Sequence, residues 1–407
     1  MSDLLSIGGN AVSAYQQALS TVSNNIANSN TEGYSLETTN IQQTAPAKMP
    51  GYFVGLGANV ESITRAYDAF TATNLRSSTS ELQAQQPMVN YTQSIVNVMG
   101  DATSGLNTSL SGYFSAAQAL SADPGSTDQR NSFLTASNAL ASQFSEVSGQ
   151  LTSIGSQASQ DLTGSVQSVN TLTKQLALIN GQSSDSPNVG SQSPMLLDQR
   201  DLLLHQLSSL TNISTSFTAN GAVTVSMSNT ISQNVVVDGQ TARPIGIANN
   251  ANGTQSLVID PYGNTQPLAG SSGGKIGGIQ TFLSQVLQPA QENFNNLAST
   301  FVSSANAIQT SGIDANGQKG LPLFNLDSSN PNAAAGISVN LTNPAQIATG
   351  AQFAAMQGAA NVSSTAAQVS YIDPGMPAAA LGNAQIQNNI NPSYDKTLAI
   401  NPNQGYA

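Results

Sequence analysis

The chain has 407 residues, which corresponds to about two to four domains of ordinary size. Only 8% of its residues are charged, against about 25% in an average soluble protein, and 10 Lys and Arg against 21 Asp and Glu leave a net charge of −11. Ten scattered cations exclude a nucleic-acid site or an anionic-lipid patch, the absence of Cys excludes thiolate chemistry, and a single His leaves little for zinc or acid–base catalysis. We therefore expect a protein that is not an enzyme and binds no metal or cofactor.

We expect no targeting signal of the common kinds at the start of the sequence. No Lys or Arg precedes Lys48, so a Sec-type signal peptide with a basic first region is not expected. No run of about 18 apolar residues occurs, so we expect no membrane insertion.

The first 28 residues show apolar positions at alternating spacings of three and four. These positions are Leu5, Gly8, Val12, Tyr15, Leu19, Val22 and Ile26. The narrow stripe matches a coiled-coil seam, although an ordinary position in a helix bundle gives the same pattern. The candidate assembly interface consists of Leu5, Val12, Tyr15, Leu19, Val22 and Ile26.

Residues 325–407 contain no heptad that could pair with this stripe. A lone helix of this composition is marginal in water. We therefore expect residues 1–30 to be mobile in the isolated chain and helical only against other subunits or a supplied C-terminal helix. The alternative is that the helix folds back on the body.

Residues 31–57 form an extended or loosely structured connection in this interpretation, because Gly and Pro recur there. Helical character resumes near Ser62 and continues to Met99, with a kink or break at Pro87. A shorter helix ends by Asp123, and Ser126 with Gln129 forms a capping-box pattern that opens the longest helix, to about residue 180. Residues 194–210 form a further helix with Pro in its first turn.

From Ile213 to about Leu268 the apolar residues alternate with polar ones, which indicates strands. The sequence Asn220–Gly221 predicts a two-residue hairpin turn between two of them. A helical stripe returns at Ile279 and continues to Gly312, with a kink expected at Pro289, and it should pack beside the long helix of residues 128–180.

These patterns predict a fold that is mainly α with an inserted β domain (α+β), in which an elongated helical bundle or coiled-coil body carries a small antiparallel β domain. The domains that we expect are an N-terminal coiled-coil helix and linker (1–60), a helical bundle (61–212), the β domain (213–275), a return helix of the bundle (276–324), and an incomplete outer β domain or disordered tail (325–407).

Candidate catalytic or binding motifs are weak. His205 has no second His or any Cys to work with, so an orienting or solvent-facing role is expected. The glycines of residues 270–276 do not complete a phosphate loop, and the stretch from Asp314 to Gly317 fits a tight turn better than a calcium loop. Asp198, Arg200 and Asp201 are expected to form a local ion pair or a contact on the helix surface.

Several motifs resemble those of a known family, and they occur in the same order along the chain. The run from Ser23 to Asn28, followed by Asn30–Thr31, Gly33 and Tyr34, resembles the N-terminal signature of bacterial flagellar rod, hook and hook-associated proteins. Three further regions resemble the flagellar hook-associated protein 1 family. They are residues 65–70 together with 75–76, residues 196–201, and residues 277–278 together with the segment that continues to residue 324. The motif residues are Asn24, Asn25, Asn28, Gly33, Tyr34, Arg65, Tyr67, Asp68, Asp198 and Arg200.

The resemblance implies a structural protein at the junction of hook and filament, outside the cell, exported without a cleaved signal peptide. Its implied partners are further copies in a homo-oligomeric ring, the hook protein, the next hook-associated or filament-side protein, and an export chaperone. Nucleic acid is not among them.

Departures from the family occur at Leu36, Glu37 and Gln309, where Arg, Gln and His are usual, and in the lack of a long C-terminal helix, from which we expect a truncated chain or fragment. Alternative functions are another rod, hook or filament subunit, or a secreted adhesin on a helical stalk.

Overall fold

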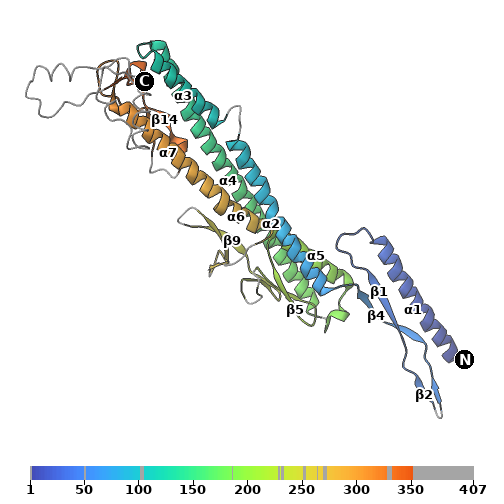
Figure 1. Cartoon of the computed structure of the whole chain (residues 1–407). Coiled ribbons are helices and arrows are strands. Elements are labelled where there is room, and N and C mark those ends of the chain that lie inside the picture. Colours follow the sequence, from blue (N-terminus) through green and yellow to red (C-terminus); the bar gives the residue numbers. More distant parts are fainter. Residues whose placement is uncertain are drawn as a thin grey trace, which may run out of the picture. The chain divides into compact units, whose positions relative to one another are not determined.

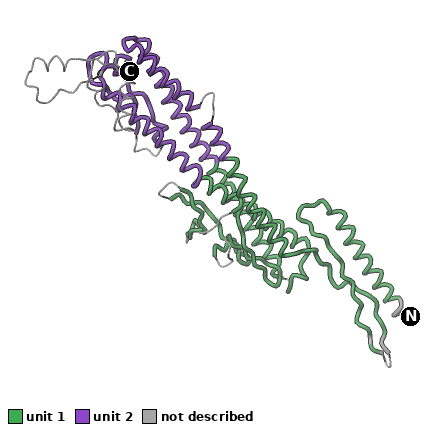
Figure 2. Tube along the Cα trace, viewed as in Figure 1, with its two compact units in different colours: residues 1–90, 158–283 green, residues 91–157, 284–407 purple. Residues whose placement is uncertain are grey.

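The computed structural model describes residues 2–49, 52–100, 105–185, 187–227, 230, 233–250, 254–263, 265–268, 273–327 and 332–351. The chain divides into two compact units, each built from two separated stretches (Figure 2). Unit 1 comprises residues 1–90 and 158–283, and unit 2 comprises residues 91–157 and 284–407. The expectation for residues 352–407 lies outside the described residues.

Unit 1 begins with a helix and a long β-hairpin (Figure 1). Helix α1 (Ser2–Ala27) is followed by β1 (Glu37–Gln43), β2 (Ala47–Met49), β3 (Tyr52–Val54) and β4 (Ala58–Arg65). Strand β1 pairs antiparallel with β4, from Glu37 opposite Arg65 onward, and β2 pairs with β3. The expected loose connection is therefore a hairpin, and the next helix starts at Ala69 rather than near Ser62, because residues 58–65 are hydrogen-bonded as a strand.

The helices of unit 1 come from both of its stretches. They are the first part of α2 (Ala69–Met99), the second part of α4 (Thr127–Ser183), the short η1 (Val189–Ser191), α5 (Pro194–Leu210) and α6 (Gly274–Thr281). Helix α2 remains one continuous helix through Pro87, which corrects the expectation of a break there. In α4 the side chains of Leu162, Val169 and Leu176 are fully buried and form its inward stripe.

The β region of unit 1 contains two antiparallel sheets. One has the order β5–β6–β7–β8 and the other β11–β10–β9. The strands are β5 (Ser214–Phe217), β6 (Val223–Ser226), β7 (Val235–Asp238), β8 (Thr241–Ala242), β9 (Ile245–Asn249), β10 (Gln255–Ile259) and β11 (Gln266–Pro267). The fold is therefore mainly α with an inserted antiparallel β region, as the sequence predicts.

The hairpin between β5 and β6 differs in one detail from its sequence signal. Phe217 lies opposite Val223, and the amide of Thr218 donates to the carbonyl of Ala222 at 2.9 Å. The loop therefore has three residues instead of two, and Gly221 takes its last position at φ +86°, where glycine is favoured.

Two asparagines on α4 hold these sheets. The side-chain amide of Asn180 donates to the carbonyl of Val223 at 2.7 Å and accepts from the amide of the same residue at 2.7 Å. Asn170 makes the same pair of bonds with Ile245, at 2.9 and 2.8 Å. Because a side-chain amide copies the donor and acceptor of a strand, each sheet is hydrogen-bonded to the long helix.

Unit 2 contains α3 (Leu106–Ala122), the first part of α4 and α7 (Gln288–Ser311). Phe144 of α4 lies 5.6 Å from Phe294 and 5.8 Å from Phe301 of α7, measured between ring centroids. These contacts place α7 beside α4, as their matching stripes predict. Between α6 and α7 the helix widens into a π-helical segment, η2 (Phe282–Leu287), which ends two residues before Pro289. Proline cannot donate the hydrogen bond of a regular turn, which accounts for the irregularity there.

The remaining elements of unit 2 are short. They are β12 (Gly312–Ile313), β13 (Phe324–Asn325), η3 (Ala333–Gly336), β14 (Ser338–Val339), η4 (Pro344–Gln346) and β15 (Gly350–Ala351). The buried Arg130 side chain of α4 anchors this segment, because it donates to the carbonyl of Ile347 at 2.7 Å and to the hydroxyl of Thr349. The carboxylate of Asp314 accepts from the amides of Asn316 and Gln318, which is the expected tight turn.

Candidate assembly surface and the adjoining ion-pair cluster

The predicted assembly stripe lies on the surface of α1. The side chains of Leu5, Val12, Tyr15, Leu19, Val22 and Ile26 are between 51% and 82% exposed. A shallow hollow on this face is lined by Ala11, Val12, Tyr15, Gln16 and Leu19. In coiled coils a side chain of the partner helix enters a hollow of this kind, so the face has the shape that helix packing requires.

The opposite face of α1 packs on the hairpin. Ala14 and Thr21 are buried there, and the hydroxyl of Thr39 in β1 donates to that of Thr21 at 2.9 Å. A Cβ on Gly57 would meet Ile7 at 3.3 Å, which shows how closely the two elements approach. Small and polar residues form most of this contact, so the apolar pattern of the sequence does not predict it.

The family-motif residues after the stripe join α1 to the hairpin. The amide of Asn25 donates to the carbonyl of Glu37 and accepts from its amide, both at 2.9 Å. The hydroxyl of Tyr34 donates to the same Asn25 oxygen at 2.7 Å. Asn28 donates to the carbonyl of Asn24 at 3.1 Å and so closes the last turn of the helix, whereas the side chain of Asn24 is exposed.

The turn after α1 depends on Gly33. Its φ is +80°, which side chains rarely tolerate. A Cβ at this position would also lie 3.1 Å from the Cβ of Leu202 in α5. Glycine therefore brings the turn onto α5.

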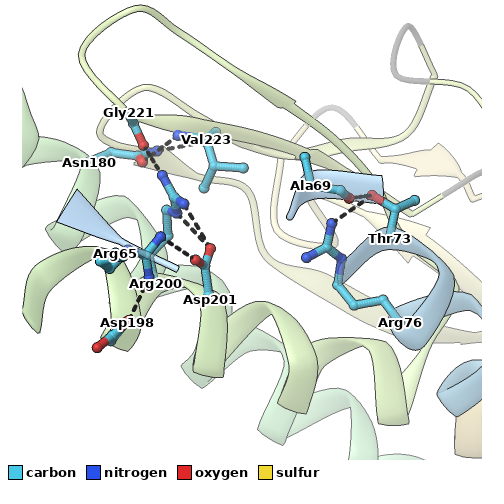
Figure 3. A network of polar contacts seen from close by, with 10 residues as sticks. All are labelled: Arg65, Ala69, Thr73, Arg76, Asn180, Asp198, Arg200, Asp201, Gly221 and Val223. Atoms are coloured by element: carbon cyan, nitrogen blue, oxygen red, sulfur yellow. Dashed lines mark hydrogen bonds and ion pairs between the residues drawn. The ribbon is translucent and has the colours of Figure 1, made fainter. Parts of the chain in front are cut away.

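Arg65, at the end of β4, forms ion pairs with two acids of α5 (Figure 3). Its guanidinium donates to Asp198 at 2.6 Å and to Asp201 at 2.8 Å. The Asp198 carboxylate also accepts from the backbone amide of Ser35 at 3.1 Å. The side chains of Arg65 and Asp198 are 6% and 9% exposed, so the pair lies in a poorly solvated site.

Arg200 extends the cluster toward the β region. It donates to Asp201 at 2.8 Å and to the carbonyl of Gly221 at 2.7 Å, and its guanidinium lies 4.5 Å from the ring centre of Phe217. The expected local ion pair is therefore present between Arg200 and Asp201. The expectation of a contact on the helix surface is corrected, because Asp198 and Arg200 are buried and the cluster connects the hairpin, α5 and the β5–β6 turn.

Glu37 and Tyr34 lie near this cluster, and both have raised pKa values. Burial raises the pKa of Glu37, and the nearby charge of Asp198 adds to that effect. Burial, followed by the charges of Glu37 and Asp198, also raises the pKa of Tyr34. Because the charged forms are disfavoured, the neutral Tyr34 hydroxyl keeps its role as a donor to Asn25.

The motif residues Tyr67 and Asp68 have local roles. The guanidinium of Arg65 lies 5.0 Å from the ring centre of Tyr67. Asp68 precedes α2 and accepts from the amide of Phe70 at 2.9 Å and the hydroxyl of Thr71 at 2.6 Å. The bond from Thr71 is the main cause that lowers the pKa of Asp68. Asp68 is thus an N-cap.

Within the described part of the chain, no group of three or more His, Cys, Asp or Glu side chains is arranged to hold a metal ion. The same residues include no helix that is both long and apolar enough to cross a membrane. The cluster consists of paired charges that stabilise contacts between elements.

Two protein-family models match the elements described above. Residues 92–324 match the model of the flagellar hook-associated protein FlgK helical domain, which is more than half of the chain. The chain belongs to the FlgK family. Residues 5–34, which contain the stripe and the motif that follows it, match the model of flagella basal body rod proteins.

Named relatives agree with this assignment to the FlgK family. Flagellar hook-associated protein 1 of Salmonella typhimurium is 32% identical over 81% of this chain and 60% of its own length. The protein of the same name from Bacillus subtilis is 27% identical over 89% of this chain and 78% of its own length. The chain thus spans about 60% of the Salmonella relative.

The fold also resembles a solved structure, the flagellar hook junction protein FlgK from Burkholderia pseudomallei. That likeness has a TM-score of 0.57 at 25% sequence identity, and it covers 63% of this chain and 47% of the other.

Proposed function

We propose that this chain is a structural axial protein of the bacterial flagellum that forms the junction between hook and filament. Membership of the FlgK family supports this function. The observation that carries it is the stripe of six exposed apolar side chains on α1, whose other face is already packed on the hairpin.

The stripe provides the driving force for assembly in this proposal. Full burial of one large apolar side chain contributes about 1.5–3 kcal/mol, and in the isolated chain these residues lie at the surface. Coiled-coil packing of α1 with terminal helices of other subunits covers them. The Arg65 cluster fixes the hairpin on α5 and so holds α1 in a defined direction within unit 1.

The partners in this proposal are further copies of the chain in a homo-oligomeric ring, the hook protein on one side, and the next hook-associated or filament-side protein on the other. An export chaperone accompanies the chain before export, which proceeds without a cleaved signal peptide. The protein acts outside the cell and has no catalytic activity. The scarcity of charge, 8% of residues, suits close lateral packing, because each buried unpaired charge is costly.

The substitution Leu19→Asp tests the role of the stripe. Leu19 is 66% exposed, so the isolated chain should remain folded, whereas a charge in a packed seam costs several kcal/mol and should abolish incorporation at the hook tip. Electron microscopy of a deletion strain that carries this variant should show hooks without filaments.

Tyr262→Asp is the matched control, because Tyr262 is 97% exposed and lies in the β region. This control should restore filaments. Normal filaments with Leu19→Asp would show that the stripe is not used in assembly.

A further inference from the structure

Glu37 lies where three elements of unit 1 meet. It opens β1 directly opposite Arg65 of β4, and its backbone is hydrogen-bonded in both directions to the side chain of Asn25 in α1. Residues directly opposite each other on antiparallel strands project to the same face of the sheet, and on that face the Arg65 guanidinium contacts α5. The half-buried side chain of Glu37 therefore belongs to the ion-pair cluster that joins the hairpin to α5.

This cluster holds more acids than cations. Arg65 donates to Asp198 and Asp201, and Arg200 also donates to Asp201 (Figure 3). In the part of the chain that the structure describes, neither Lys nor Arg forms an ion pair with Glu37, although Arg65 lies opposite it. Three carboxylates thus share two guanidinium groups, and Glu37 is the carboxylate that has no cation.

The other groups around Glu37 do not compensate its charge. On the side of α1 it meets the neutral amide of Asn25. The Tyr34 hydroxyl donates to the same amide, and burial together with the charge of Glu37 raises the pKa of Tyr34. Glu32, in the turn between α1 and β1, is an exposed acid. An ionised Glu37 therefore keeps its full charge beside the acids of α5.

The charge of Glu37 opposes the contact that attaches the hairpin to α5. Asp198 holds both the guanidinium of Arg65 and the amide of Ser35, and Glu37 repels Asp198 when both are ionised. Burial, followed by the charge of Asp198, accordingly raises the pKa of Glu37. The stabilisation that accompanies the proton is present at acidic pH and is lost as pH rises through this raised pKa.

We propose that Glu37 is a proton-sensitive control of the attachment between the hairpin and α5, which is tight when Glu37 is neutral and loosened when Glu37 is charged. Helix α1 moves with the hairpin, because Thr21 and Asn25 are hydrogen-bonded to β1. The control therefore acts on the direction of the apolar stripe of α1. At neutral pH the stripe can adjust its direction as it packs on other subunits, and in this role the inference rests on the proposed function.

The substitution Glu37→Gln tests the control, because it removes the charge and keeps the size of the side chain. In the isolated full chain at neutral pH, the amide of Ser35, which donates to Asp198, should exchange its hydrogen several-fold more slowly than in the unsubstituted protein. The difference between the two proteins should disappear at mildly acidic pH, where Glu37 takes up its proton. The other acids of the cluster titrate in both proteins, so this difference isolates Glu37.

A distance measurement reports on the direction of the hairpin itself. Gln42 of β1 and Gln206 of α5 are exposed, and the chain has no native Cys. Spin labels on Gln42→Cys and Gln206→Cys should therefore give a distribution of distances between hairpin and α5 by pulsed electron paramagnetic resonance. At neutral pH, Glu37→Gln should narrow this distribution, and lowering the pH of the unsubstituted protein should narrow it in the same way.

Glu61→Gln is the matched control, because it removes the same charge from an exposed position of the same hairpin. It should change neither measurement. An equal effect of Glu61→Gln would show that the total charge of the hairpin, and not the cluster, is responsible. An effect of Glu37→Gln that is absent or independent of pH would overturn the inference and leave the proposed function standing. Normal filaments with Leu19→Asp would instead overturn the role of the stripe and leave the charge effect at Glu37 standing.

Discussion

At the scale of single residues, Asp198 connects distant parts of unit 1. It pairs with Arg65, which lies 133 residues earlier, and accepts from the amide of Ser35. Removing Asp198 leaves Arg65 with Asp201 as its remaining ion-pair partner and takes from the amide of Ser35 its carboxylate acceptor. Asp198 therefore contributes, together with Asp201, to the attachment of the hairpin to α5.

The substitution Asp198→Ala should lower the free energy of unfolding by about 1.5–3 kcal/mol, the value of a hydrogen bond to a charged group. Urea denaturation followed by circular dichroism measures the change. Glu61→Ala is the control in the same hairpin, because Glu61 accepts from Asn40 at 3.0 Å in an exposed pair, which is worth about 0–1 kcal/mol. Equal effects of the two substitutions would contradict the role of Asp198.

Sequence patterns identified most motif residues at this scale but not what they touch. Asp198, Arg200 and Asp201 were recognisable as a charge cluster on a helix. Their partner Arg65 was not, because hydrogen bonds between residues more than a hundred positions apart leave no periodic signal. Long-range hydrogen bonds at shorter separation are missed for the same reason, as between Asn180 and Val223, which are 43 residues apart, and so is the bond between Arg130 and Ile347, which are 217 apart.

At the scale of elements, α6 lies so close to α2 that no side chain fits between their backbones at Gly278. A Cβ on Gly278 would lie 2.1 Å from the carbonyl oxygen of Ala84, a backbone atom. The two helices could accept any side chain there only by moving apart. Glycine at this position therefore sets their separation.

Gly278→Ala should destabilise unit 1 by about 1–3 kcal/mol or more. Gly164→Ala is the matched control in α4, where a Cβ meets nothing within 4 Å, and it should stabilise the chain by about 0.5–1 kcal/mol. The two denaturation midpoints should move in opposite directions. A shift of both midpoints in the same direction would show that helix propensity, and not the close approach of α6 to α2, determines the effect of Gly278→Ala on stability.

Periodicity predicted the helices well and the hairpin poorly. Leu140, Phe144, Val147 and Leu151 form a regular stripe, and all are almost fully buried. Strand β1, with the sequence ETTNIQQ, has one large apolar residue and thus little alternation to detect. The α1 stripe shows a further limit, since its pattern equals that of a buried stripe while its residues are exposed.

At the scale of the whole molecule, the packing of α1 is one-sided. Ala14 and Thr21 are buried against the hairpin, but every member of the apolar stripe is exposed. Most of the stability of a helix comes from burying its apolar face. The expected mobility of residues 1–30 in the isolated chain therefore stays a prediction, although the structure gives α1 a partner that was not foreseen.

Hydrogen exchange on the isolated full chain measures this mobility. Amides from Val12 to Ile26 should exchange faster than those from Leu140 to Ile154, whose apolar side chains are buried. The buried segment from Leu140 to Ile154 serves as the internal reference. Equal protection of the two segments would show that the hairpin alone holds α1.

Arg130 has a consequence for the order in which the chain folds. Its partners Ile347 and Thr349 lie 217 and 219 residues later, and all of residues 158–283 belong to the other unit. A ribosome delivers the first half of α4 long before α7 and the segment that Arg130 binds. Until then Phe144 lacks its contacts with the rings of Phe294 and Phe301. Closure of so long a loop is entropically costly, so unit 2 should be the last part of the molecule to reach its native state.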